Sequence, residues 1–454
     1  MDAVQSASAV ATAERASAAR FGAYLYTQFF SAFNDNVHQM AIALYLAHAS
    51  GALEGEAGKW QSIISAAFVA PFILFSSLAG TLADRFEKRT ILIAAKWLEV
   101  VPMSVSLVST FLPAPAQYYG LIAGIFLMEV RAAFFSPAKY GILPEITGSD
   151  RLVRANGILQ MLTMVAIVSG EAVGGLVING FILGGLAVSP YNIRIAISIC
   201  LGIAVVGSLL AIWIPRGAPG DSSRPIQANP LSQVWSAVRQ MRADRILVIT
   251  TFTLSAFWMV ATMFRMNIPL FGRFALEVKP FQTSLLWVFV SVGIGIGAAL
   301  AGIVKKSDES MGLVLPGAIG MAVASAAAGL LGRDFTGSAA ILAILGLFGG
   351  LYLVPQTAIF QARSPADRRG AYLAVQNFAN YAFMAVAAGI FFLMTGKLGL
   401  KSREVFIVVG IGLAGLGAVQ CALQPALVVG MAKVLLSRIF GVKAAATESK
   451  ATAP

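Results

Sequence analysis

From residue 28 to residue 39 the chain reads QFFSAFNDNVHQ, which places seven polar side chains inside an otherwise apolar run from Phe21 to Ala47. An apolar run of this length predicts a membrane-spanning helix, where a carboxylate near the centre costs roughly 2.5–3.5 kcal/mol. Helical spacing puts most of the polar groups on one face, with one stripe of Gln28, Ser31, Asp35 and Gln39 and a neighbouring stripe of Thr27, Asn34 and His38. We expect that face to line a cavity, away from lipid.

The composition of the whole chain is that of a membrane protein. Its 454 residues are 58% apolar and 12% charged, with a mean hydropathy of +0.79, whereas soluble domains carry about 25% charged residues. Twelve apolar segments recur, at residues 21–48, 60–82, 90–112, 118–137, 155–186, 190–214, 245–272, 282–304, 311–331, 338–362, 371–395 and 404–430. The sequence therefore predicts an all-α polytopic membrane protein with twelve transmembrane helices.

Lysine and arginine in the short connections indicate the orientation, because cytoplasmic loops retain positive charge. Most of these residues lie in the connections on the side of the two chain ends, so both termini are expected to be cytoplasmic. The net charge of +12 follows from this bias and suits anionic lipid headgroups, so nucleic acid is not expected as a partner. Residues 1–20 are predicted to be a disordered tail, 215–244 a cytoplasmic linker ending in an amphipathic helix, and 431–454 a basic tail.

Three short strings recur in the same order on both sides of that linker. They are Ser31-Ala-Phe33 with Ser255-Ala-Phe257, Leu78-Ala-Gly80 with Leu300-Ala-Gly302, and Ser136-Pro-Ala138 with Ser364-Pro-Ala366. Their shared order indicates a parallel repeat of six spans plus six, an arrangement that transporters use. We expect an N-terminal bundle over 21–214 and a C-terminal bundle over 245–430, around a central cavity.

The connection after the second span reads GTLADRFEKR from residue 80 to residue 89. It resembles the signature loop of the major facilitator superfamily, G-x-x-x-D-R-x-G-R-R, and lies at the same place in the chain, although Glu87 stands where the family has glycine. The resemblance implies that Gly80 allows helices to approach closely and that Asp84 faces the N-terminus of the eleventh span. The gating motif so implied consists of Gly80, Asp84, Arg85, Lys88 and Arg89.

Two further stretches carry a more specific resemblance. Residues 32–36 read AFNDN and residues 136–143 read SPAKYGIL, and both are similar to strings of the bacterial lysophospholipid transporter family; residues 348–350, 354–355 and 374–377 agree. The resemblance implies the major facilitator fold and a flippase that carries lysophospholipid, above all lysophosphatidylethanolamine, across the bacterial inner membrane to the cytoplasmic face for reacylation. It also implies a separate acyltransferase or acyl-carrier-protein synthetase as partner. We expect the transporter itself to be a monomer.

A lysophosphatidylethanolamine headgroup needs a carboxylate for its ammonium and cations for its phosphate. We expect Asp35 to bind the ammonium, Arg265 to bind the phosphate in the periplasmic half, and Lys139 to bind it near the cytoplasmic side. The other candidates are neutral donors or buried carboxylates, namely Asn34, Asn36, Gln376, Asn377, Glu129 and Glu171. Alternatively, Asp35 pairs with Arg265 or Lys139 only to hold the bundles together.

Three further charges lie within predicted spans. Lys96 and Glu99 are three residues apart, a spacing that predicts an ion pair within one helix at a helix contact. Arg131 lies on a different side of its helix from Glu129, and we expect it to make an interbundle or loop-facing contact.

Two other functions fit the same spans. One is a proton-coupled major facilitator exporter of drugs or metabolites, with Asp35, Glu129 and Glu171 as protonation sites; the other is a membrane scaffold for a separate acyltransferase. An enzyme is not expected, because neither His38 nor His48 is followed by aspartate in an H-x-x-x-x-D acyltransferase pattern. No cluster of side chains has metal-ligand spacing, and no cofactor is expected.

Overall fold

The computed structural model describes residues 2–49, 51, 53–147, 152–180, 188–215, 235, 238–303, 311–365, 369–425, 427, 429 and 431. The first half contains α1 (Asp2–Ala49), α2 (Glu54–Arg85), α3 (Lys88–Leu98), α4 (Val100–Ser109), α5 (Ala116–Thr147), α6 (Leu152–Ile178) and α7 (Pro190–Ala211). The second half contains α9 (Arg245–Leu270), η2 (Phe271–Ala275), α10 (Pro280–Ile303), α12 (Val314–Leu331), α13 (Phe335–Arg363), α14 (Arg369–Phe392), η3 (Leu393–Lys397) and α15 (Ser402–Leu423).

The helices confirm the predicted fold class. Within the described residues, 11 helical spans are long and apolar enough to cross a membrane. We count α1 as the twelfth, because its length suffices and only its polar stripe lowers its hydropathy. The third span consists of α3 and α4, which join at Glu99, and single π-helical turns, η2 and η3, extend α9 and α14.

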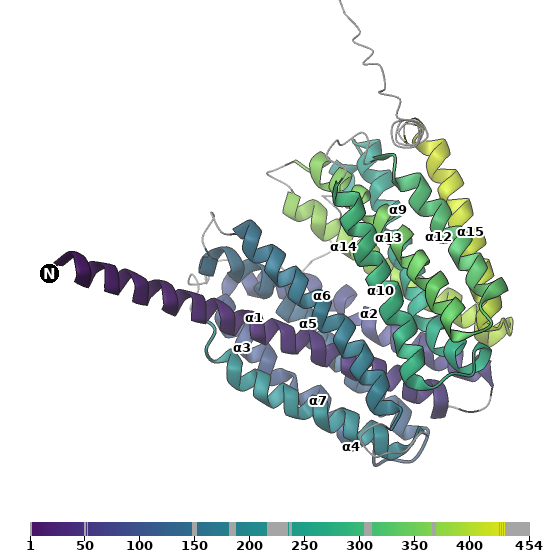
Figure 1. The fold of residues 1–454 in the computed structure, drawn as a ribbon, viewed down its shortest axis with the longest axis horizontal. Helices are drawn as coiled ribbons and strands as arrows, with labels where there is room; N and C mark the ends of the chain where they lie inside the picture. The colour runs from purple at the N-terminus through teal and green to yellow at the C-terminus, as the bar shows by residue number, and fades with distance from the viewer. Residues whose placement is uncertain are drawn as a thin grey trace, which may run out of the picture.

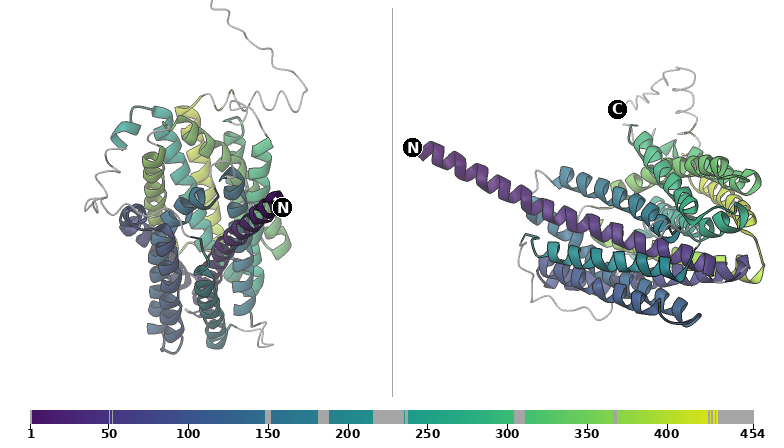
Figure 2. Two further views of the ribbon diagram at one scale, coloured as in Figure 1. Left: turned by 90° about the vertical axis from the view of Figure 1, so that its left-hand side faces the viewer. Right: turned by 60° about the horizontal axis from the view of Figure 1, so that its bottom comes forward.

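The first helix is longer than expected. It begins at Asp2 and so includes residues 2–20, for which the sequence predicted a disordered tail; many of these residues are alanine, which has the highest helix propensity. Figure 2 shows this part of α1 projecting beyond the other helices. The predicted basic tail from residue 432 onward and most of the predicted linker lie outside the described residues. Within the linker, Trp235 and residues 238–241 are helical.

The helices form two bundles, each with its own apolar core. In the N bundle, α1 to α7, α1 packs against α6 and α7, and α2 packs against α5. In the C bundle, α9 to α15, α13 packs against α10 and α12, and α9 packs against α14. Close packing depends on glycine at some contacts: a Cβ at Gly170 of α6 would lie 2.6 Å from the Phe33 carbonyl oxygen of α1.

The two bundles meet at the ends of the helices that carry the α1–α2 connection, which we call the first-loop side. There the Glu54 carboxylate accepts a hydrogen bond from the Ser402 amide at 2.6 Å, and Arg273 donates to the Gly51 carbonyl at 2.8 Å. Helix α2 contacts α14, and α6 contacts α10. Figure 1 shows the bundles as the two arms of a V that diverge toward the opposite side.

Gly58 allows this closure of the first-loop side. A Cβ at Gly58 of α2 would lie 2.5 Å from the Thr395 Oγ1 and 2.8 Å from its Cβ, so a larger residue must push α2 away from η3. We expect Gly58→Val to favour opening of the first-loop side by about 1–3 kcal/mol, the usual cost of overpacking. Spin labels at Glu56→Cys and Lys397→Cys, in a background without natural cysteines, would report a longer distance.

Gly202 on α7 provides the matched control for that measurement. A Cβ at this position meets no described atom within 4 Å, and the residue is exposed. Gly202→Val should therefore leave the distance distribution unchanged. An unchanged distribution in Gly58→Val as well would show that the contact with Thr395 does not control closure.

Candidate functional site

Glu99 lies at the centre of a buried polar network in the N bundle. Its Oε2 accepts hydrogen bonds from Lys96 at 2.6 Å and from Ser31 at 3.2 Å, and its Oε1 accepts one from Asn34 at 2.7 Å. The side chains of Lys96 and Glu99 are both 0% exposed, and the ion pair expected from their spacing is confirmed. The network thus joins the third span to α1.

Arg131 on α5 extends this network to Asp35 on α1. Its Nη2 donates to both carboxylate oxygens of Asp35, at 2.5 and 2.7 Å. Its Nη1 donates to the Ser31 hydroxyl at 3.0 Å and lies 3.6 Å from the Glu99 carboxylate. The Arg131 side chain is 2% exposed, whereas the Asp35 side chain is 26% exposed. Asp35 is therefore held by Arg131 and still accessible.

The partner of Asp35 differs from the one that we expected. Arg131 faces the interior of its own bundle and pairs with Asp35. The sequence instead suggested that Arg131 makes an interbundle or loop-facing contact. It also suggested Lys139 or Arg265 as the partner of Asp35. Lys139 lies two turns further along α5, about 12 Å away along the axis, and is half-buried. Its charge still interacts with that of Asp35.

Arg265 on α9 reaches from the C bundle into the N bundle. Its guanidinium donates to the Gln39 side chain on α1 and lies 3.6 Å from the Glu171 carboxylate on α6. The guanidinium carbon is 5.9 Å from the ring centroids of both Phe68 and Trp287, close enough for cation–π attraction. Arg265 is 33% exposed, whereas Glu171 is fully buried. Arg265 thus links three helices of the N bundle to the C bundle.

The Arg265 guanidinium reaches α1 close to Asp35. Gln39, the partner of Arg265, follows Asp35 by one helical turn, about 6 Å along the axis. Glu129 on α5 is buried, and the charges of Asp35, Arg131 and Arg265 all act on it. The structure therefore brings together an accessible carboxylate from one bundle and an accessible guanidinium from the other.

A cavity of about 150 Å³ adjoins Arg265 between the bundles. Its walls are mostly apolar and aromatic and come from both bundles, with the lining residues Gln39, Met40, Ala43, Gln61, Ile64, Ser65, Phe68, Trp258, Ala261, Thr262, Arg265, Met266, Ile268, Pro269, Thr283, Trp287 and Met384. Apolar walls around one cation suit a ligand that has an anionic group and a hydrocarbon part.

The four amide side chains of the expected site lie in different places. Asn34 belongs to the network around Glu99, and Asn36, which is half-buried, donates to a carbonyl of its own helix at 2.7 Å. Gln376 is buried between α9 and α14 and donates to Asn380 at 2.7 Å. Asn377 is exposed on α14. In this conformation no hydrogen bond within the described residues joins any of these four amide groups to the Asp35 carboxylate or the Arg265 guanidinium.

The signature loop forms contacts within the N bundle. Lys88 pairs with Glu145 of α5 at 2.6 Å, and Arg89 donates to the carbonyls of Ile212 and Ile214 at 2.8 and 2.6 Å, which caps the end of α7. Glu87, at the place of the family's glycine, has φ −55° and ψ 124°, an extended conformation that any residue adopts. The substitution therefore leaves the loop unstrained.

The remaining residues of the gating motif lie at the end of α2 where the bundles diverge. A Cβ at Gly80 would meet no described atom within 4 Å, so the close helix approach expected there does not occur in this conformation. Arg85 is half-buried in the last turn of α2, and the Asp84 side chain lies outside the described part of the structure.

Comparisons with known proteins agree with this architecture. The chain matches the Major Facilitator Superfamily model over residues 24–388. Among solved structures, a D-xylose-proton symporter superposes with a TM-score of 0.64 at 17% identity, covering 87% of this chain and 96% of that one. A POT family transporter in complex with 5-aminolevulinic acid also gives a TM-score of 0.64, at 14% identity, covering 90% of this chain and 96% of that one. At these identities the likeness shows the fold alone.

Curated relatives are more similar in sequence. The lysophospholipid transporter LplT of Pectobacterium carotovorum is 31% identical over 386 residues, covering 84% of this chain and 87% of the relative. LplT of Photorhabdus laumondii is 32% identical and covers 83% of this chain and 89% of the relative. LplT of Klebsiella pneumoniae is 30% identical and covers 88% and 94%. The members of this superfamily are transporters, and not enzymes. This chain therefore belongs to the major facilitator superfamily and, within it, to the LplT family.

Proposed function

We propose that the protein carries lysophospholipids, with lysophosphatidylethanolamine as the leading substrate, across a bacterial inner membrane toward the cytoplasmic face, where they are reacylated. Both termini are placed in the cytoplasm by this proposal, so the closed first-loop side faces the periplasm. The transport step is alternating access of the two bundles. The names of the relatives support the substrate class, and the charge bias of the loops supports the orientation.

The observation that carries the proposal is the pair of unlike charges on opposite bundles. Asp35 and Arg265 are both partly exposed. Gln39, which accepts the hydrogen bond from Arg265, lies one helical turn, about 6 Å, from Asp35 along α1. An ethanolamine headgroup presents an ammonium and a phosphate that are separated by two carbons. One headgroup can therefore meet the Asp35 carboxylate and the Arg265 guanidinium together.

The proposal includes a way in which the headgroup is exchanged between sites. Arg265 already binds Gln39 and lies near Glu171, so an arriving phosphate replaces contacts between the bundles with contacts to the substrate. Loss of such contacts favours separation of the bundles around Arg265. Lys139, nearer the other side, offers a second cation from which the phosphate can leave.

Substitution of Arg265 tests the phosphate role. In proteoliposomes, Arg265→Gln should lower flipping of fluorescent lysophosphatidylethanolamine at least tenfold, because about 1.5–3 kcal/mol of charge-assisted hydrogen bonding is lost. Arg265→Lys should lower flipping less, because the charge is kept while the planar, bidentate grip is lost. Equal flipping by wild type and Arg265→Gln would exclude the phosphate role.

A second function, proton-coupled export of drugs or metabolites, is favoured by one observation. Glu171 is fully buried beside Arg265, and Glu129 is buried near Asp35, so both carboxylates lie where a proton could control an ion pair. Dissipating the proton gradient distinguishes the functions. Flipping that persists without the gradient supports the lysophospholipid flippase, and collapse of transport supports the exporter. Flipping by the purified protein alone would exclude a scaffold for a separate acyltransferase.

A further inference from the structure

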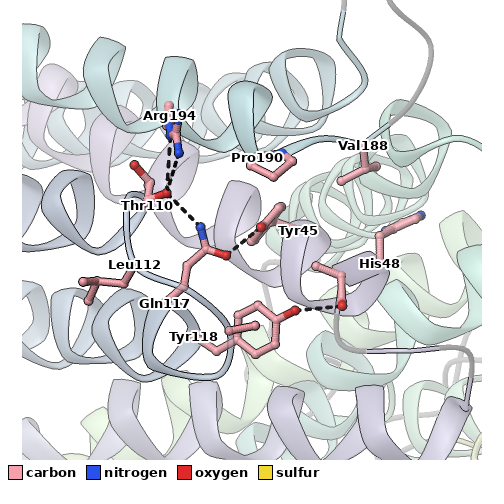
Figure 3. Close-up of a pocket in the computed structure, with 11 residues that line it drawn as sticks. Tyr45, His48, Thr110, Leu112, Gln117, Tyr118, Val188, Pro190 and Arg194 are labelled. Carbon is pink, nitrogen blue, oxygen red and sulfur yellow. Dashed lines mark hydrogen bonds between the residues drawn. The ribbon is translucent and has the colours of Figure 1, made fainter.

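A second cavity, with polar walls, lies within the N bundle at the first-loop side, and none of its lining residues comes from the C bundle. Its volume is about 430 Å³, within the range of small-ligand sites. The end of α1, the turn between α4 and α5, and the first turns of α5 and α7 form its walls (Figure 3). The lining residues are Tyr45, His48, Ala49, Thr110, Leu112, Ala114, Gln117, Tyr118, Val188, Pro190 and Arg194.

Arg194 supplies a fixed positive charge to this cavity. Its Nε and Nη2 donate to the Thr110 carbonyl at 3.3 and 3.1 Å. Its guanidinium carbon lies 4.4 Å from the ring centroid of Phe111 and 5.5 Å from that of Tyr191. Among the described residues, Nη1 has no hydrogen-bond acceptor. The arginine is thus held in place with one nitrogen available for an anion.

The other polar groups of the cavity are ordered around this charge. Tyr45 donates to Gln117 at 2.8 Å, and Gln117 donates to the Thr110 carbonyl at 3.1 Å, as Figure 3 shows. The Nδ1 of His48 is 2.8 Å from the Leu44 carbonyl oxygen. None of the 11 lining residues is an aspartate or a glutamate. The lining therefore favours an anion.

Exposed aromatic side chains place the cavity at the level of lipid headgroups. Phe111, Tyr119 and Tyr191 surround this end of the bundle and are 65%, 55% and 64% exposed. Tyrosine rings gather where the hydrocarbon of a membrane meets the headgroups. A phosphate bound at Arg194 would thus lie at the depth of lipid phosphates, with an acyl chain free to extend into the bilayer.

We propose that this cavity binds the phosphate ester of a phospholipid headgroup, with Arg194 as the phosphate ligand. Resting on the proposed function, the site holds a lysophospholipid at the first-loop side before it reaches Asp35 and Arg265. A guanidinium with a rigid position suits a phosphate, because the hydrogen bond costs little ordering. A soluble phosphate ester has the same chemistry, and the experiment separates the two sources.

Binding to the full-length protein in nanodiscs tests the site. The background is the double variant Asp35→Asn and Arg131→Gln, which removes the central carboxylate while keeping the number of charges balanced. Three probes are titrated: lysophosphatidylethanolamine, glycerophosphoethanolamine, which is the same headgroup without a chain, and inorganic phosphate. We expect Arg194→Gln to weaken lysophosphatidylethanolamine binding at least tenfold, about the value of one charge-assisted hydrogen bond.

Two further variants keep the result interpretable. Leu112→Trp fills the cavity without changing any charge and should also weaken binding. This variant keeps Arg194, so it tests the cavity independently of any effect that loss of Arg194 has on the α4–α5 turn. Arg333→Gln removes an exposed arginine of the same side and should bind like the parent. If Arg194→Gln and Leu112→Trp both bind as tightly as Arg333→Gln, the site is excluded.

The probes and the transport assay separate the remaining outcomes. Equal affinity for glycerophosphoethanolamine and for the lysolipid would overturn the assignment to a lipid. If binding depends on Arg194 while the wild type flips no lysophospholipid in proteoliposomes, the cavity is a headgroup site and the proposed function is wrong. If flipping depends on Asp35 while Arg194→Gln leaves the affinity for lysophosphatidylethanolamine unchanged, the proposed function stands and the cavity is not part of it.

Discussion

Asparagine in place of Asp35 is expected to abolish headgroup transport and to destabilise the protein, whereas adding Arg131→Gln is expected to restore stability without restoring transport. Asp35→Asn leaves the Arg131 guanidinium, 2% exposed, without its main counterion. Removing one member of a fully buried pair costs about 3–5 kcal/mol. We expect about 2–3 kcal/mol here, because the pair is partly exposed and Glu99 still lies 3.6 Å from Arg131.

The double variant separates a binding role from a structural one. Asp35→Asn with Arg131→Gln removes one negative and one positive charge, so no buried charge is left unpaired. If Asp35 serves only to hold α1 against α5, the double variant should recover both thermal stability and flipping. If Asp35 binds the ammonium, flipping should stay at least about tenfold below wild type while the unfolding temperature recovers.

Substrates with different headgroups sharpen this test. A carboxylate that binds an ammonium should matter for lysophosphatidylethanolamine and matter less for a lysophospholipid without a cationic group. Flipping of both substrates is measured in the same proteoliposomes, with unfolding followed in parallel. If the double variant loses flipping of both substrates equally, Asp35 acts in a transport step that is common to both, and not in recognition of the ammonium.

The sequence was sufficient for features that depend on local spacing. The twelve spans follow from apolar segments of about 20 residues, and the Lys96–Glu99 pair follows from a three-residue offset within one helix. The clustering of polar groups on one face of α1 also placed Gln39 beside Asp35, although its role as the partner of Arg265 was missed. These features need no knowledge of how helices rotate against one another.

The tertiary partners could not be predicted, because they depend on how the helices rotate against one another. Asp35 and Arg131 are 96 residues apart, and their pairing depends on the rotation of α5 about its axis. A stripe of polar residues fixes which side of α1 is buried, but it does not fix which helix meets that side. Gln376 shows the same limit, because its described hydrogen bonds go to Asn380 on its own helix and to Thr251 and Ser255 on α9.

Glutamine in place of Glu99 is expected to be the most destabilising change in the protein that leaves the shape of the site intact. Glu99 accepts hydrogen bonds from Lys96, Ser31 and Asn34, and its side chain is 0% exposed. Glutamine has nearly the same volume, but it leaves the fully buried Lys96 ammonium without an anion. We expect a loss of about 3–5 kcal/mol in the free energy of unfolding, measured in detergent micelles or bicelles.

A second substitution identifies the unpaired charge as the cause. Lys96→Met together with Glu99→Gln removes both charges and keeps an oxygen that can accept the hydrogen bond from Asn34, so most of the stability should return. Lys88→Gln serves as a comparison, because the Lys88–Glu145 pair is 20% and 18% exposed and its loss should cost less. If Glu99→Gln is no more destabilising than Lys88→Gln, the network around Glu99 does not stabilise the N bundle. If the double variant is stable and still flips lipid, the network supports Asp35 only through its structure.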